Sequence, residues 1–167
     1  YAWMRDAGYP QVTEDAILDH LAAENSYRDQ VTAPLQGLTK RLFEELKGRI
    51  SDEDSSVPQR DGAYIYQWAF EKGAQYRRWL RWPHDDPETK TLLLSEPDRA
   101  AGCDHYVLGD LSISFDDQLM AISEDVAGDE RYVVRVKSIA EDQFLDDEIS
   151  PTRGHVQWAA DSAGFFY

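Results

Sequence analysis

The chain has 167 residues, of which 42% are hydrophobic and 12% aromatic, and its 17 Lys and Arg against 32 Asp and Glu give a formal net charge of −15. This apolar content excludes a disordered chain, and the length fits one domain or pieces of two. The charge opposes binding to nucleic acid or to an anionic membrane, because phosphate recognition needs clustered cations.

A single cysteine, Cys103, excludes an internal disulfide and a cysteine-based zinc site. The sequence contains no long apolar run and no pattern typical of a signal peptide. We therefore expect a cytoplasmic protein that carries neither a metal nor a cofactor. A periplasmic location stays open, since position 1 is Tyr rather than Met and we expect further polypeptide upstream.

Residues 1–50 follow a helical period and form the first predicted domain. Thr13 is a plausible N-cap for a first helix, which we expect to end near Tyr27. Pro34 suits the first turn of a second helix, and Gly48 suits its C-terminal stop. The apolar positions at helical spacing are Val12, Ile17, Leu18, Leu21 and Ala22 in the first helix, and Leu35, Leu38, Leu42 and Leu46 in the second. One apolar stripe on each helix predicts that each packs on another surface.

Residues 51–167 form the second predicted domain and alternate like strands after a polar linker at 51–56. Turn signals separate the strands at residues 71–74, 116–117, 127–129 and 146–147. The predicted strands are 64–69, 76–82, 91–94, 106–114, 119–123, 132–138, 156–158 and 164–167. About four strands in each repeat of roughly fifty residues are typical of β-propeller blades. The fold class is therefore a helical segment followed by all-β structure, with blades 1 and 2 and the start of blade 3.

Residues 76–82 interleave cations with aromatic rings, a pattern that can serve single-stranded nucleic acid. The net charge opposes that interpretation. The favoured alternative is an ordinary strand with its aromatic side chains on one face and its arginines on the other.

The sequence holds none of the common catalytic signatures. Gly-x-Ser-x-Gly does not occur, and the four histidines (His20, His84, His105 and His155) are scattered. We expect His20 to be solvated on the first helix. The run at 52–56 lacks the glycine and the closing glutamate of a calcium loop, so we interpret it as part of the linker.

Acidic residues are concentrated in the second half of the chain, where residues 104–148 hold thirteen Asp and Glu against three Lys and Arg. Neighbouring acids on a strand point to opposite faces and are poor acid–base partners. An acidic rim would instead attract basic peptides, an effect that salt would screen.

Several segments, in the same order and at similar spacing, resemble the prolyl oligopeptidase family of serine peptidases, and within it the oligopeptidase B branch. These segments are Tyr1-Ala2-Trp3-Met4-Arg5-Asp6, the helix that closes on Glu24-Asn25-Ser26-Tyr27, residues 42–50, Asp54-Ser55-Ser56-Val57-Pro58 and the turn at 71–76. Ser114-Phe115-Asp116-Asp117 is similar to the family's Ser-Pro-Asp-Gly turn, with Phe115 in place of Pro and Asp117 in place of Gly. The departure bears on the type of turn rather than on the blade.

The resemblance implies a two-part enzyme, in which a seven-bladed propeller caps a C-terminal α/β-hydrolase domain and admits only short peptides. It implies a serine-type endopeptidase that cleaves after Arg or Lys and whose Ser, Asp and His lie outside these residues. The chain alone would then be inactive, with the hydrolase domain and short basic peptides as its partners. Asp104, Glu124, Asp125 and Glu130 are the candidate residues that face the hydrolase domain or the peptide.

The absence of a hydrolase domain from these residues affects the expected behaviour of the isolated chain. Without the hydrolase domain, the helical stripes and unfinished blades would leave apolar faces and strand edges uncovered, so we expect the isolated chain to self-associate. A non-enzymatic propeller scaffold and a peptidase of the prolyl-specific sister group both remain open. The sequence does not decide between Arg or Lys and Pro as the preferred residue, nor does it give the oligomeric state.

Overall fold

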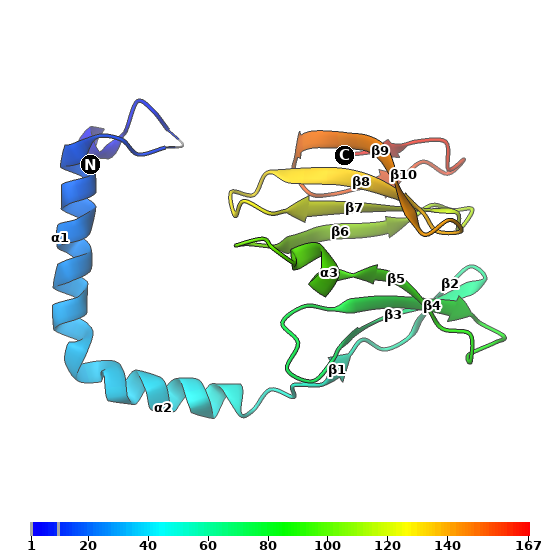
Figure 1. The fold of residues 1–167 in the computed structure, drawn as a ribbon, viewed down its shortest axis with the longest axis horizontal. Helices are drawn as coiled ribbons and strands as arrows, with labels where there is room; N and C mark the ends of the chain where they lie inside the picture. Colours follow the sequence, from blue (N-terminus) through cyan, green and yellow to red (C-terminus); the bar gives the residue numbers. More distant parts are fainter. Residues whose placement is uncertain (1, 10) are drawn as a thin grey trace. The chain divides into compact units, whose positions relative to one another are not determined.

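The computed structural model describes residues 2–9 and 11–167, so Tyr1 of the predicted opening motif lies outside the described residues. The chain divides into two compact units, with the boundary between Ser51 and Asp52. Figure 1 shows helices in the first unit and strands in the second.

The first unit contains η1 (Ala2–Met4), α1 (Asp15–Thr32), η2 (Ala33–Leu35) and α2 (Gln36–Lys47). The N-cap of α1 is Glu14 rather than the predicted Thr13, and its side chain makes no capping hydrogen bond. Asp6 takes over this task, because its Oδ2 accepts hydrogen bonds from the backbone N–H groups of Thr13 and Glu14. Hydrogen bonds from the N–H of Gly8 and from these two groups lower the pKa of Asp6 below its ordinary value of 3.8.

The helix boundaries also differ from the prediction where the two helices meet. The first helix continues past Tyr27 to Thr32, and Pro34 lies in the short η2 that joins α1 to α2. Gly48 caps α2 as predicted. His20 is half-buried against the ring of Trp3, 4.9 Å between centroids, so the expectation of a solvated side chain was wrong.

The apolar stripe is clear in α2, where Leu38, Leu42 and Leu46 are all exposed. In α1 the apolar residues are spread more widely around the helix, and only Ile17 is buried. The prediction of a single narrow stripe therefore holds for α2 and not for α1.

The second unit contains three antiparallel sheets. The first is built from β1 (Asp54–Ser55), β2 (Gln59–Asp61), β3 (Tyr64–Phe70), β4 (Arg78–Pro83) and β5 (Thr91–Ser95). The second has the order β6 (Val107–Ile113), β7 (Leu119–Asp125), β8 (Tyr132–Ser138) and β9 (Gln143–Thr152). The third consists of β10 (Gln157–Trp158) and β11 (Phe165–Phe166). These sheets confirm the predicted fold class of two blades and the start of a third.

Four elements of this unit were not predicted from the sequence. One is the strand β2, where Gln59–Asp61 pair with Tyr64–Tyr66. Asp54 and Ser55, predicted as linker, pair with Phe70 and Ala69 of β3. The predicted turn at Asp146 and Asp147 lies inside the long strand β9. The helix α3 (Glu96–Ala100) follows β5 directly and was not predicted.

The core lies between successive sheets. Met120 and Ile122 of β7 are fully buried against Leu93 and Leu94 of β5. Ala121, between them in the sequence, points the other way and packs in a second cluster with Val134, Val136, Val156 and Trp158. Because side chains of a strand alternate between faces, β7 contributes to the contacts with both neighbouring blades. Complete burial of a Met or Ile side chain contributes about 2 kcal/mol, so these contacts set the spacing of the blades.

The predicted separation of aromatic and cationic faces in residues 76–82 was wrong. The guanidinium of Arg81 lies 4.2 Å from the ring centre of Tyr64, and that of Arg77 lies 5.1 Å from the ring of Trp79. Cations and rings therefore share a face and stack on one another, which stabilises the first blade.

Asp117 replaces the glycine of the similar family turn and still adopts a left-handed φ of 61°. Asp tolerates this conformation better than most residues. The β6–β7 hairpin keeps its antiparallel register up to Ile113 and Met120, so the departure changes no strand.

Candidate functional site

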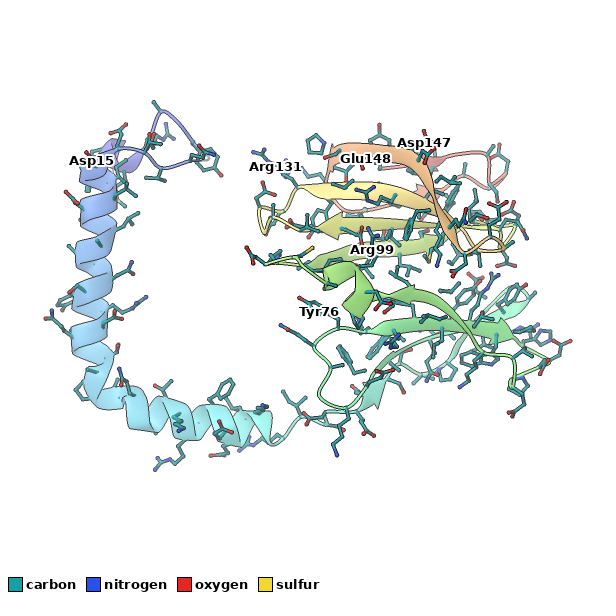
Figure 2. All side chains as sticks on the ribbon, in the orientation of Figure 1. Asp15, Tyr76, Arg99, Arg131, Asp147 and Glu148 are labelled. Atoms are coloured by element: carbon teal, nitrogen blue, oxygen red, sulfur yellow. The ribbon has the colours of Figure 1, made fainter. Side chains whose placement is uncertain are left out.

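The loops of the second unit gather at two ends of the sheets. One end, which we call the α3 end, holds the turn at 71–77, the helix α3, the loop at 101–106 and the loop at 126–131, as the positions of Tyr76, Arg99 and Arg131 in Figure 2 show. The turns at 62–63, 84–90, 114–118 and 139–142 lie at the other, which we call the Asp117 end. Two contacts align the blades at the α3 end: the ring of Tyr76 lies 5.5 Å from that of Tyr106, and Arg99 pairs with Glu124.

All four candidate residues, Asp104, Glu124, Asp125 and Glu130, lie at the α3 end. Asp54 pairs with Phe70, the last residue of β3, so the second unit also begins at this end. Asp104 and Glu130 are exposed, whereas Glu124 and Asp125 are buried. Two of the four candidate carboxylates are therefore accessible to solvent, and the other two are buried in the protein.

Glu124 is the centre of a buried polar cluster. Its side chain is only 3% exposed and accepts hydrogen bonds from Arg99 Nε at 2.8 Å and Nη2 at 2.5 Å. The Tyr106 hydroxyl donates a third hydrogen bond at 2.9 Å, and Arg135 Nε lies at 3.8 Å. Burial, and next the charge of Glu124, raises the pKa of Tyr106 above its ordinary value of 10.0, so the phenol stays a donor. With its oxygens engaged in this way, Glu124 holds the architecture together and has no free oxygen for proton transfer.

Arg99 comes from α3, and the same helix also binds the first blade. Glu96 is buried and accepts hydrogen bonds from Arg77 Nε at 2.9 Å and Trp79 Nε1 at 2.7 Å. α3 therefore links blade 1 through Glu96 and blade 2 through Arg99. The start of this helix has a local cause: Ser95 is the N-cap, its Oγ accepts from Asp98 N, and Pro97 lies in the first turn.

Asp125 organises the loop between β7 and β8. Its carboxylate accepts three backbone N–H groups, from Ala127 at 2.9 Å, Gly128 at 2.8 Å and Glu130 at 2.9 Å. Gly128 has a φ of 78°, and the ring of His105 lies against it. Asp125 thereby fixes the backbone at Glu130, whose own φ is 59°.

This arrangement predicts how the loop responds to pH. Burial would raise the pKa of Asp125, but the three N–H groups and the nearby His105 outweigh it and hold the pKa below 3.8. The stabilisation is therefore complete above that value and is lost as the pH falls through the lowered pKa. We expect the protection factors of amides in the loop at 126–131, which correct for the slower intrinsic exchange in acid, to fall as the pH is lowered, and Asp125→Asn to reproduce this loss at neutral pH. Asp129→Asn in the same loop is the matched control, read at residues 126–130 because Asp129 itself accepts the N–H of Arg131. Equal protection in both variants would contradict the prediction.

Among residues 2–9 and 11–167, no three His, Cys, Asp or Glu side chains are placed to hold a metal ion. Within the same described residues, no helix has the length and apolar character needed to cross a membrane.

The comparison with known proteins decides the family. Residues 1–167 match the family described as prolyl oligopeptidase, N-terminal beta-propeller domain. The chain belongs to the prolyl oligopeptidase family. This is a family of peptidases, and the match covers both the helical unit and the sheets.

Two curated proteins are similar to the whole chain. The chain is 30% identical to dipeptidyl aminopeptidase BI of Pseudoxanthomonas mexicana, in an alignment that covers 100% of the chain and 25% of that protein. It is 23% identical to protease 2 of Moraxella lacunata, covering 100% of the chain and 24% of that protein. The chain thus spans about a quarter of the length of these curated relatives.

Solved structures of oligopeptidase B share this fold. Oligopeptidase B from Leishmania major superposes with a TM-score of 0.80 at 26% identity, covering 93% of the chain and 22% of that protein. The closed form of oligopeptidase B from Trypanosoma brucei, with covalently bound antipain, superposes with a TM-score of 0.77 at 25% identity, covering 93% of the chain and 22% of that protein. The chain therefore corresponds to the N-terminal helices and the first propeller blades of a prolyl oligopeptidase family member.

Proposed function

We propose that this chain is the N-terminal part of a serine oligopeptidase that hydrolyses short peptides after Arg or Lys. The observation that carries the proposal is the superposition on oligopeptidase B at a TM-score of 0.80. The net charge of −15 is a second support, since an acidic protein attracts basic peptides. The full enzyme would attack the peptide carbonyl with a serine activated by a histidine, both supplied by polypeptide outside this chain.

The proposed contribution of this chain is to limit access and to contact the catalytic domain. A propeller built of tightly packed blades excludes folded proteins from its interior, while short peptides pass. We assign residues 1–50 to docking on an α/β-hydrolase domain through the exposed apolar side of α2. We assign residues 51–167 to the propeller, with its α3 end towards that domain because the second unit begins there.

Within this proposal, the four carboxylates of the α3 end have two roles. Asp104 and Glu130 are exposed and would meet the catalytic domain or the peptide directly. Glu124 and Asp125 are buried and would act by fixing the loops that carry those residues. Cross-linking of the full-length protein through carboxylates would test this role, and cross-links from Asp104 and Glu130 that never reach the catalytic domain would contradict it.

The test of the proposed activity is a panel of short peptides with Arg, Lys or Pro before the scissile bond, incubated with the full-length protein. Cleavage after Arg and Lys, and no cleavage of a folded protein that contains the same sequence, is the expected result. Cleavage after Pro would move the protein to the prolyl-specific sister group. The absence of any hydrolysis would favour the non-enzymatic propeller scaffold.

A second activity is favoured by the 30% identity to dipeptidyl aminopeptidase BI. An enzyme of that kind would release dipeptides from a free N-terminus. The panel therefore includes each peptide with a free and with a blocked N-terminus, since only an endopeptidase cleaves both.

Self-association is the expected behaviour of the 167-residue chain when it is made alone. Leu42 and Leu46 are about half exposed, at 45% and 58%, and Phe43 beside them is 60% exposed. Such an apolar surface favours association when its partner is absent. Sedimentation should show dimers or larger species, and Leu42→Glu should shift the chain towards monomer. A monodisperse monomer of the unmodified chain would contradict the expectation.

A further inference from the structure

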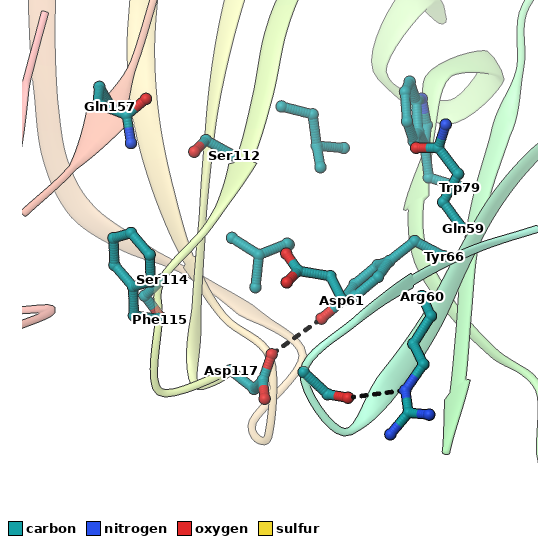
Figure 3. A pocket seen from close by; sticks show the side chains of 13 residues that line it. Gln59, Arg60, Asp61, Tyr66, Trp79, Ser112, Ser114, Phe115, Asp117 and Gln157 are labelled. Atoms are coloured by element: carbon teal, nitrogen blue, oxygen red, sulfur yellow. Dashed lines mark hydrogen bonds between the residues drawn. The ribbon is translucent and has the colours of Figure 1, made fainter. Parts of the chain in front are cut away.

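A cleft of about 580 Å³ opens at the Asp117 end, between the first two blades (Figure 3). Its walls come from β2, from β6 with the following turn, and from Gln157 of β10. This volume falls in the range of sites that take a small molecule or a large side chain. None of the four candidate carboxylates of the α3 end lines it.

Two carboxylates from neighbouring blades line the cleft. The side chain of Asp61 makes no hydrogen bond or ion pair with the part of the chain that the structure describes. Asp117 uses Oδ1 to accept a hydrogen bond from the Tyr66 hydroxyl at 3.1 Å, which leaves Oδ2 without a donor among those residues. The cleft therefore offers carboxylate oxygens from two sides, as the close view shows for Asp61 and Asp117.

The nearby cations have other partners. Arg60 Nε donates to the backbone oxygen of Gly62 at 3.4 Å, and in Figure 3 its guanidinium points away from Asp61. Arg81 Nη1 donates to the backbone oxygen of Asp117 at 3.0 Å and stacks on Tyr64. Neither arginine forms an ion pair with the two lining carboxylates, so these keep their charge available for a ligand.

Aromatic rings supply the remaining wall. Tyr66 and Trp79 are half-buried in the lining, and Phe115, which is 65% exposed, lies across the cleft from them in Figure 3. A planar guanidinium suits this combination, because it stacks on rings and donates hydrogen bonds to carboxylates in its own plane. An ammonium group has the charge but lacks the flat face.

We propose that this cleft binds the arginine side chain of a peptide. Asp61 is the main counter-charge, Asp117 Oδ2 is a second acceptor, and Phe115 covers the guanidinium. That the peptide is a substrate of the enzyme rests on the proposed function. The binding itself rests only on the cleft and its lining.

The experiment measures binding of N-acetyl-arginine methylamide to the full-length protein by calorimetry. The protein is first treated with a lysyl chloromethyl ketone, which fills any subsite for a basic residue beside a reactive histidine. N-acetyl-citrulline methylamide has the same shape without the charge and is the control ligand. The variants are Asp61→Asn and Phe115→Ala, and Asp146→Asn on the exposed strand β9 is the matched control.

The arginine probe should bind the unmodified protein more tightly than the citrulline probe, and Asp61→Asn should weaken it by about fivefold, as expected for a partly exposed charged pair. Phe115→Ala should weaken it as well, and Asp146→Asn should leave it unchanged. Equal binding of both probes, or full binding to Asp61→Asn, would overturn the proposal. A failure of the proposed function would be detected separately from this binding test. In that case the full-length protein would neither hydrolyse peptides nor be labelled by the ketone.

Discussion

Replacing Glu124 by alanine should destabilise the α3 end by about 3 kcal/mol, because it leaves the charge of Arg99 without its buried partner. Glu124 is 3% exposed and Arg99 is 32% exposed, so water compensates the arginine only in part. The Tyr106 hydroxyl loses its acceptor at the same time. Glu124→Gln keeps the shape and one acceptor oxygen and should therefore cost less.

The measurement is hydrogen exchange of the full-length protein, read at β6 and β7 and at the loops beside them. A loss of about 3 kcal/mol corresponds to roughly a hundredfold faster exchange for amides whose exchange rate follows the opening equilibrium. Glu148→Gln is the matched control, because Glu148 pairs with Arg135 at 2.8 Å and its side chain is 51% exposed. Such an exposed pair contributes about 0.5 kcal/mol. If Glu124→Ala and Glu148→Gln behaved alike, the buried cluster would not stabilise this end.

A double-mutant cycle identifies the partner. Once Glu124 is removed, Arg99→Ala should add little to the loss, because the two residues share one interaction. Additive effects would mean that Arg99 stabilises α3 through other contacts, such as its position over the Phe144 ring at 4.8 Å.

The hairpins were predictable because their sequence signals are local. The strand β8 alternates between apolar and basic residues, and β7 starts with a short apolar run typical of a strand buried on both faces. Gly128 marks the turn between them with its positive φ of 78°. β9 was missed because it is the edge of its sheet, where exposed acids such as Asp146 and Asp147 replace alternation. Charged residues are common on edge strands, since they prevent pairing with other chains. In the sequence these acidic residues therefore led to the prediction of a turn at 146–147.

The polar cluster of the α3 end was only half predictable. Glu124 and Asp125 were singled out as acids, but their burial depends on Arg99, which lies 25 residues earlier, and on the backbone of a loop. α3 has five residues, too few for a helical period, although Ser95 followed by Pro97 is a start signal. The cleft at the Asp117 end was missed for a similar reason. Asp61 and Asp117 are far apart in sequence, and they line the same cleft only because the first two blades pack together.

Tyr132 explains why two glycines are needed in blade 2. A Cβ at Gly109 would lie 2.5 Å from Tyr132 Cε1 and 2.7 Å from Cδ1, and one at Gly154 would lie 2.9 Å from Cδ2. The two edges of the ring therefore face two glycines, one beside the bulge of β6 and one after β9. Gly154 also has a φ of 88°, which makes any substitution there strained.

Gly109→Ala is expected to destabilise the protein by about 2 kcal/mol, the usual cost of forcing an extra methyl group into a packed site. Gly109 tests packing alone, since its φ lies outside the left-handed region. Thermal unfolding of the full-length protein measures the loss, and Tyr132→Val in the same chain should recover part of it by removing the ring. Gly164→Ala is the control, because nothing lies within 4 Å of its added Cβ. If Tyr132→Val gave no recovery, the clash with the ring would not be the cause, and the Oγ of Ser123, 2.8 Å from the same added Cβ, would have to resist the methyl group instead.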